Sequence, residues 1–191
     1  MKLLEDRIIS DGRVLEGEIL KVDSFLNHQI DPVLIKDMAA EWKRLYDGVR
    51  VDSVLTIEAS GIPMACFTAL EFGCNCVFAK KSKSSNIAED VYSAKVHSFT
   101  HGNDNDVIVN KRFIREGDNI LIIDDFLANG AALLGLIDIC KQGGANVVGC
   151  GIAIEKAFQA GGATIRNMGY RVESLARIGE MKPNGEIEFV K

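Results

Sequence analysis

Residues 120–132 read ILIIDDFLANGAA and decide the fold. The first four are branched and apolar without alternation, which is typical of a strand buried on both faces at the centre of a parallel sheet. Asp124 and Asp125 follow at the carboxyl end of this strand, the end at which open α/β sheets bind their ligands. Adjacent carboxylates suit the hydroxyl groups of a sugar or a hydrated Mg²⁺ ion, which favours one or two carboxylates together with substrate oxygens. We therefore expect the chemistry of the protein at this turn.

The five small residues after the acids predict a phosphate site. Because they lack bulk, the free N–H groups at the start of the following helix can surround a phosphate, aided by the positive end of the helix dipole. Apolar residues at helical spacing over 133–140 indicate that helix, and Gly143 and Gly144 end it before a strand over 147–155. Strand, acids, turn, helix and strand form one βαβ unit. The residues of the turn are Ala128, Asn129, Gly130, Ala131 and Ala132.

A second strand-to-helix turn lies earlier in the chain. Asp31 and Pro32 begin a helix that Gly48 ends, and a strand over 51–57 follows it. That strand runs into a turn containing Ser60 and Gly61, and Pro63 is expected to open the next helix. The turn suits an anion, although by itself it is more typical of an ordinary βα connection.

A basic segment and a long polar segment come next. A short strand over 77–79 leads into a loop containing Lys80 and Lys81, which is placed for pyrophosphate but would also suit a solvated surface. Residues 84–105 are polar and include an alternating stretch over 91–99 that is compatible with one arm of a hairpin. Long insertions of this kind are commonly lids.

Composition narrows the range of possible partners. With 191 residues and 47% hydrophobic content, the chain can bury the core of a single domain over residues 1–191. Its net charge of −5 argues against nucleic acid or an anionic membrane as the main partner. The N-terminus becomes charged too early for a secretory signal, and no apolar run approaches membrane-spanning length, so we expect a cytoplasmic protein.

The stretch at 120–132 resembles the 5-phosphoribosyl 1-pyrophosphate (PRPP) signature of the type I phosphoribosyltransferases. The usual signature ends in Ala-Thr-Gly-Gly-Thr, and both threonine hydroxyls are absent here, so the phosphate would rely on backbone amides and Asn129. The segments 11–15, 20–32 and 58–62, with Lys156, resemble the xanthine-using branch of this family in bacterial purine salvage. The resemblance implies a mainly parallel sheet flanked by helices, a flexible hood loop and a small N-terminal base-binding segment.

The resemblance also implies an activity, namely transfer of the phosphoribosyl group of PRPP to xanthine. It implies that Mg²⁺ is held mainly through the substrate and that the protein forms a homodimer. The acids Asp124 and Asp125 would hold the ribose hydroxyls and favour positive charge on the sugar, while the turn over 128–132 would hold the 5-phosphate. The residues implied to frame xanthine are Leu20, Asn27 and Lys156. Those implied to contact pyrophosphate are Ser60, Gly61, Lys80 and Lys81.

Two alternatives remain open at this point. PRPP-sensing transcription regulators reuse the fold without turnover, but they add a winged helix, and only about thirty residues precede the helix at Asp31. An enzyme for adenine, guanine or hypoxanthine is the second alternative. Ser60 departs from the adenine-type pattern, whereas guanine and hypoxanthine share the 6-oxo group of xanthine.

Overall fold

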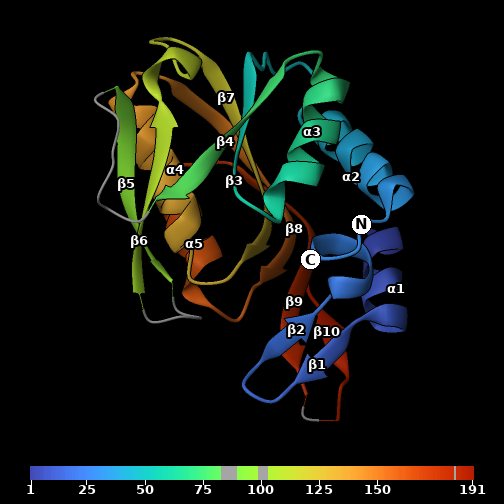
Figure 1. Ribbon diagram of the computed structural model, residues 1–191. Helices are drawn as coiled ribbons and strands as arrows, with labels where there is room; N and C mark the ends of the chain where they lie inside the picture. The colour runs from blue at the N-terminus through green and yellow to red at the C-terminus, as the bar shows by residue number, and fades with distance from the viewer. Residues whose placement is uncertain (83–89, 99–102, 183) are drawn as a thin grey trace.

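The computed structural model describes residues 1–82, 90–98, 103–182 and 184–191 (Figure 1). The helices are α1 (Lys2–Asp11), α2 (Pro32–Leu45), α3 (Gly61–Phe72), α4 (Ala131–Gln142) and α5 (Ala160–Asn167), with a π-helical turn η1 (Asp23–Asn27) and a 3-10 turn η2 (Lys111–Phe113). The strands are β1 (Arg13–Leu15), β2 (Ile19–Lys21), β3 (Ser53–Ile57), β4 (Asn75–Ser82), β5 (Val91–Ser98), β6 (Asn103–Asn110), β7 (Asn119–Leu127), β8 (Asn146–Lys156), β9 (Val172–Met181) and β10 (Ile187–Phe189).

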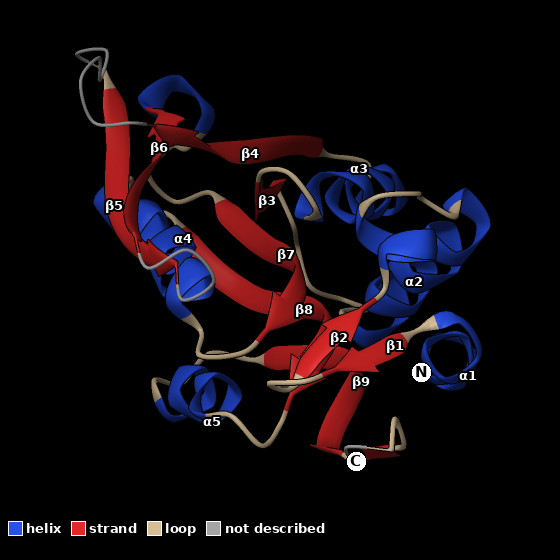
Figure 2. Ribbon diagram, turned by 60° about the horizontal axis from the view of Figure 1, so that its bottom comes forward, coloured by secondary structure: helices blue, strands red, loops and turns tan. Residues whose placement is uncertain are grey.

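A mainly parallel sheet forms the centre of the molecule. Within the described ranges its strand order is β10-β9-β8-β7-β3-β4-β6-β5. The central run from β9 to β4 is parallel throughout, whereas β10, β6 and β5 pair antiparallel at the two edges. Helices α4 and α5 lie on one side of the sheet and α2 and α3 on the other (Figure 2). The predicted fold class is therefore confirmed.

Strand β7 is central and buried on both faces, as its sequence predicts. Leu121 and Ile123 pack with α2 and α3, while Ile120 and Ile122 pack with α4 on the opposite face. The strand does not end at the acids, however. Pairing with β8 continues as far as Leu127, so Asp124 and Asp125 lie inside the last part of β7 rather than after it.

Helix starts follow the expected local signals with one difference. The Asp31 carboxylate accepts from the backbone N–H groups of Val33 and Leu34, both at 3.1 Å, and caps α2 as expected. Helix α3 begins at Gly61, two residues before Pro63. A proline is tolerated there because the first N–H groups of a helix have no partner within the helix.

Lys80 and Lys81 lie in a strand, not in the loop that we expected. Strand β4 continues through Ser82 because β6 pairs with its second half, with Lys80 opposite Ile108 and Lys81 opposite Val107. This partner is distant in sequence, so the local pattern could not reveal it. The expected hairpin arm over 91–99 is confirmed as β5, which pairs with β6.

The hood prediction falls partly outside the described residues, which omit 83–89 and 99–102. Within the described part of this segment, Ala94 and Val96 of β5 are buried. Both face α4, where a Cβ on Gly135 would lie 2.6 Å from Val96 Cγ2. The mobility of the hood stays a prediction.

The N-terminal segment contains a helix that the sequence did not indicate. Only Leu4 and Ile8 of α1 are buried, so its apolar stripe is too narrow to recognise as a pattern. The Met1 amino group donates to the carbonyl of Leu175, which attaches the start of the chain to β9. In the described part of the chain, none of the helices combines the length and apolar character needed to span a membrane.

Candidate active site

The acid pair forms a buried, hydrogen-bonded unit at the end of β7. Asp124 is 5% exposed, and its Oδ1 accepts from the backbone N–H of Asp125 at 3.0 Å. The pKa of Asp124 is raised well above its ordinary value, mainly because the side chain is buried and secondly because of the charge of Asp125. The charge of Lys81 lowers this pKa. Lys81 is therefore near enough to the acid pair to act on its charge, and its contact with pyrophosphate stays a prediction.

Asn27 joins the N-terminal segment to this acid pair. Burial raises the pKa of Asp125, opposed by hydrogen bonds from the backbone N–H of Phe126 and from the side chain of Asn27. Asn27 is half-buried at the end of η1. Asn27 therefore lies near Asp125, although about a hundred positions separate the two residues in the chain.

The turn between β3 and α3 lies against the same acids. A Cβ at Gly61 would stand 3.3 Å from Asp124 Oδ1 and 2.0 Å from Thr56 Oγ1, so only glycine fits. Glu58 Oε1 accepts from the backbone N–H of Lys81 at 2.6 Å and ties the turn to β4. The predicted pyrophosphate residues Ser60 and Gly61 therefore begin α3 beside the acid pair.

Lys80 occupies a different environment from Lys81. Its ammonium group lies 5.9 Å from the centre of the Phe78 ring, two residues earlier on the same strand. Because successive side chains of a strand alternate between its faces, Lys80 and Lys81 point in opposite directions. The two lysines therefore lie on different faces of β4, and the role of each at pyrophosphate stays a prediction.

The predicted phosphate turn is built from close backbone contacts. Gly130 has a φ of 87° and precedes the first residue of α4. The N–H of Gly161, at the start of α5, donates to the carbonyl of Ala128 at 3.0 Å. Asn129 Oδ1 accepts from the N–H of Ala131 at 2.9 Å and so shapes the turn. In the structure this oxygen caps the turn, which leaves the amide nitrogen of Asn129 as its donor toward an anion.

Lys156 and Leu20 place the N-terminal hairpin over the end of β8. The Lys156 ammonium group donates to the carbonyl of Glu18 at 2.8 Å, and burial lowers the pKa of Lys156. Glu18 has a φ of 58° in the turn between β1 and β2. Leu20, on β2, is 7% exposed and packs in the core. The residues implied to frame the base therefore come from two segments that fold together.

A buried ion-pair network was not predicted from the sequence. Glu155 is 1% exposed at the end of β8, and Arg166 donates to its two carboxylate oxygens at 2.6 and 2.7 Å. Ser174 and Arg177 donate to Glu155 Oε2 at 2.5 and 3.2 Å. Because these partners come from α5 and β9, only the three-dimensional fold reveals the network. It fixes the strand end that carries Lys156.

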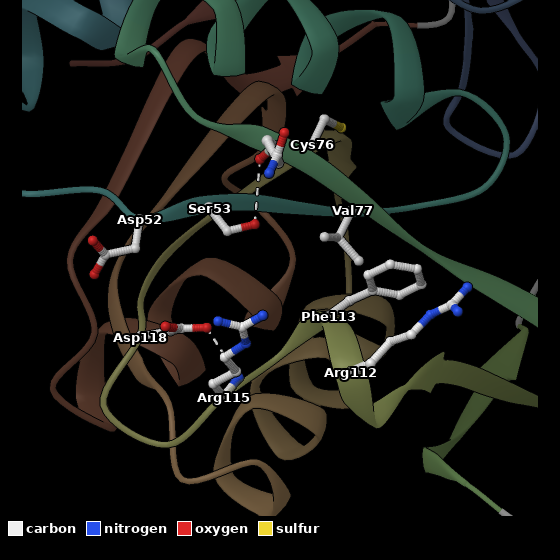
Figure 3. A pocket seen from close by; sticks show the side chains of 9 residues that line it. Asp52, Ser53, Cys76, Val77, Arg112, Phe113, Arg115 and Asp118 are labelled. Carbon is white, nitrogen blue, oxygen red and sulfur yellow. Dashed lines mark hydrogen bonds between the residues drawn. The ribbon is translucent and has the colours of Figure 1, made fainter.

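A pocket of about 530 Å³ lies at the other end of the sheet (Figure 3). Ser53 and Asn75, the first residues of β3 and β4, line it, and the Ser53 hydroxyl donates to the Asn75 carbonyl at 3.3 Å. Arg115 and Asp118 line another wall, where the Asp118 carboxylate accepts from the backbone N–H of Arg115 at 2.9 Å. None of the site residues predicted from the sequence lines this pocket.

Comparison with known proteins agrees with this geometry. Residues 21–169 match the model of the phosphoribosyl transferase domain family. The xanthine phosphoribosyltransferase of Lachnoclostridium phytofermentans is 54% identical over 190 residues, covering 99% of this chain and 98% of that protein. That of Bifidobacterium adolescentis is 53% identical, covering 99% of each.

Solved structures support the fold. Adenine phosphoribosyltransferase from Giardia lamblia, complexed with 9-deazaadenine, superposes with a TM-score of 0.77 at 20% identity, covering 91% of this chain and 97% of that one. The Saccharomyces cerevisiae enzyme gives 0.72 at 19% identity, covering 92% and 99%. The chain belongs to the phosphoribosyltransferase family, in the group of the xanthine phosphoribosyltransferases.

Proposed function

We propose that the protein transfers the phosphoribosyl group of PRPP to xanthine and releases xanthosine 5'-monophosphate and pyrophosphate. The observation that carries this proposal is the meeting of three segments at one strand end. The acid pair of β7 lies near Asn27 of the N-terminal segment and against Gly61 at the start of α3. The identity of 54% to a xanthine phosphoribosyltransferase supports xanthine as the base.

The acids act by binding and by charge. Asp124 and Asp125 accept from the ribose hydroxyls of PRPP, and the negative charge that the pair carries favours the positive charge that develops on the sugar as pyrophosphate leaves. Lys81, close to Asp124, offsets the charge of the departing pyrophosphate. The N–H groups at the start of α4 hold the 5-phosphate. No covalent intermediate with the protein is needed.

The same acids fit a Mg²⁺ ion. Two neighbouring carboxylates, Asp124 buried and Asp125 half-buried, form an anionic site that a hydrated divalent cation suits. Asp124 and Asp125 would supply the protein oxygens, and the remaining ligands would be oxygens of PRPP and water. When bound, the ion neutralises charge on the pyrophosphate.

The base is held between the N-terminal hairpin and the end of β8. We assign Asn27 to the 2-oxo group of xanthine, because its amide nitrogen has two N–H donors. Lys156 lies along the 6-oxo and N7 side, and Leu20, a buried residue of β2, borders the base. These three roles follow from the family resemblance and from the placement of β2, η1 and β8.

We further propose that the protein acts as a cytoplasmic homodimer, as the resemblance implies. Leu70, Phe78 and Phe113 expose 75%, 39% and 47% of their surface on α3, β4 and η2. Phe78 and Phe113 line one pocket, so they form a shared apolar surface that a second copy of the chain would cover in the dimer. Sedimentation velocity of the purified protein at micromolar concentration tests this assembly, and a species with the mass of one chain would contradict it.

A variant with Asp124→Asn and Asp125→Asn tests the proposed mechanism. Loss of both charges should lower the rate of xanthosine monophosphate formation by at least about 100-fold, because each carboxylate acts on the developing positive charge. Asp118→Asn, in the pocket at the opposite sheet end, is the matched control and should retain the wild-type rate. Near-normal turnover by a folded double variant would refute the roles of the acids.

A further inference from the structure

Thr56 has a buried hydroxyl group that makes no hydrogen bond with the described residues. It is the next-to-last residue of β3 and is 0% exposed. Its Oγ1 has no hydrogen-bond partner among the residues that the structure describes. A buried unpaired hydroxyl lowers stability, and valine has nearly the same shape without this cost. The hydroxyl therefore needs an explanation other than packing.

The surroundings of Thr56 point to Asp124. A Cβ built on Gly61 would lie 2.0 Å from Thr56 Oγ1 and 3.3 Å from Asp124 Oδ1. The hydroxyl and the carboxylate oxygen therefore face the same small space, which stays open because residue 61 is glycine. Asp124 Oδ1 already accepts from the N–H of Asp125 at 3.0 Å. A carboxylate oxygen has a second lone pair, which leaves room for one more donor.

We infer that Thr56 is a positioning residue, whose hydroxyl donates to Asp124 Oδ1 across the gap at Gly61 when PRPP binds. Both oxygens border the space that a Cβ at residue 61 would fill, so in this inference the Asp124 side chain turns toward Gly61 to form the bond. The bond then holds Oδ1 still, so that the other oxygen of the carboxylate meets a ribose hydroxyl in a fixed orientation. This inference rests on the proposed function, since it assigns Asp124 to the ribose.

Thr56→Val tests this role because it removes the hydroxyl and keeps the shape. We expect kcat to fall about tenfold, the effect of one hydrogen bond to a charged group, while KM for PRPP and xanthine changes less than about twofold. The midpoint of thermal unfolding should equal or exceed that of the wild type. Thr56→Ser restores the hydroxyl and should recover kcat to within about threefold of the wild type.

Thr68→Val is the matched control. Thr68 is also 0% exposed, but its hydroxyl donates to the carbonyl of Met64 at 2.8 Å within α3, away from the acids. Its replacement should leave kcat within about twofold of the wild type. A loss of kcat in Thr56→Val that Thr56→Ser recovers, with no loss in Thr68→Val, supports the positioning role.

Three outcomes overturn the inference. Wild-type kcat in Thr56→Val would show that the hydroxyl does not act on Asp124. Equal losses of kcat in Thr56→Val and Thr56→Ser would show a packing role. A wild-type protein that turns over no purine base would overturn the proposed function and this role together, whereas the first two outcomes leave the proposed function intact.

Discussion

Replacement of Glu155 by glutamine tests the buried network that fixes the end of β8. Arg166 and Arg177 both donate to this carboxylate, which is 2% exposed, while the two arginine side chains are 32% and 31% exposed. Removing one partner of a buried ion pair costs about 3–5 kcal/mol. Because the arginines keep contact with water, we take the lower end, about 3 kcal/mol, which lowers Tm by about 6–12 °C in a chain of this size.

The effect should depend on pH in a defined direction. Burial alone would raise the pKa of Glu155, but the hydrogen bonds from Arg166 and Ser174 outweigh it, so its folded-state pKa lies below its ordinary value. The stabilisation is therefore complete above the ordinary carboxyl pKa and is lost as the pH falls through the folded-state pKa. The difference in Tm between wild type and Glu155→Gln should shrink as the pH falls from about 5 toward 3.

Scanning calorimetry at several pH values measures both effects. Glu180→Gln is the matched control, since Glu180 is exposed on β9, and its Tm should stay within about 2 °C of the wild type. A Glu155→Gln variant that unfolds within about 2 °C of the wild type at pH 7 would refute the stabilising role. So would a Tm difference that grows as the pH falls.

Two further variants test the site. Asn27→Ala should lower kcat/KM for xanthine about tenfold or more, but kcat/KM for hypoxanthine less than about threefold. The reason is that only xanthine has the 2-oxo group that the Asn27 amide binds, so only xanthine loses this hydrogen bond. Equal losses of kcat/KM for both bases would refute the role of Asn27 in selectivity. Lys81→Met should raise KM for PRPP about tenfold, the effect of one charge-assisted contact. Its control, Lys80→Met, should change KM less than about twofold, and equal effects of the two variants would contradict the assignment.

The sequence was sufficient to predict an element wherever the residues that determine that element lie within it or next to it in the chain. The apolar run over 120–123 predicts a strand buried on both faces, and Asp31 with Pro32 predicts the start of α2. The small residues after the acids predict the turn into α4, and Gly130 lies immediately before that helix. In each case residues close together in the chain determine the local structure, so the sequence alone is enough to predict it.

Features that depend on distant partners could not be predicted in this way. Strand β4 extends through Lys80 and Lys81 because β6 pairs with it, and β6 begins some twenty residues later. The network at Glu155 needs side chains from α5 and β9. The proximity of Asn27 to Asp125 depends on how the N-terminal segment folds back over the sheet. Only the family resemblance placed Asn27 at the site beforehand.

Base selection tests the central claim most directly. Purified protein is assayed with PRPP, Mg²⁺ and xanthine, hypoxanthine, guanine or adenine in separate reactions, and the nucleotide and pyrophosphate are quantified by chromatography. We expect the highest kcat/KM for xanthine, with equimolar xanthosine 5'-monophosphate and pyrophosphate. A higher kcat/KM for another base, or no nucleotide from any base, would contradict the proposed function.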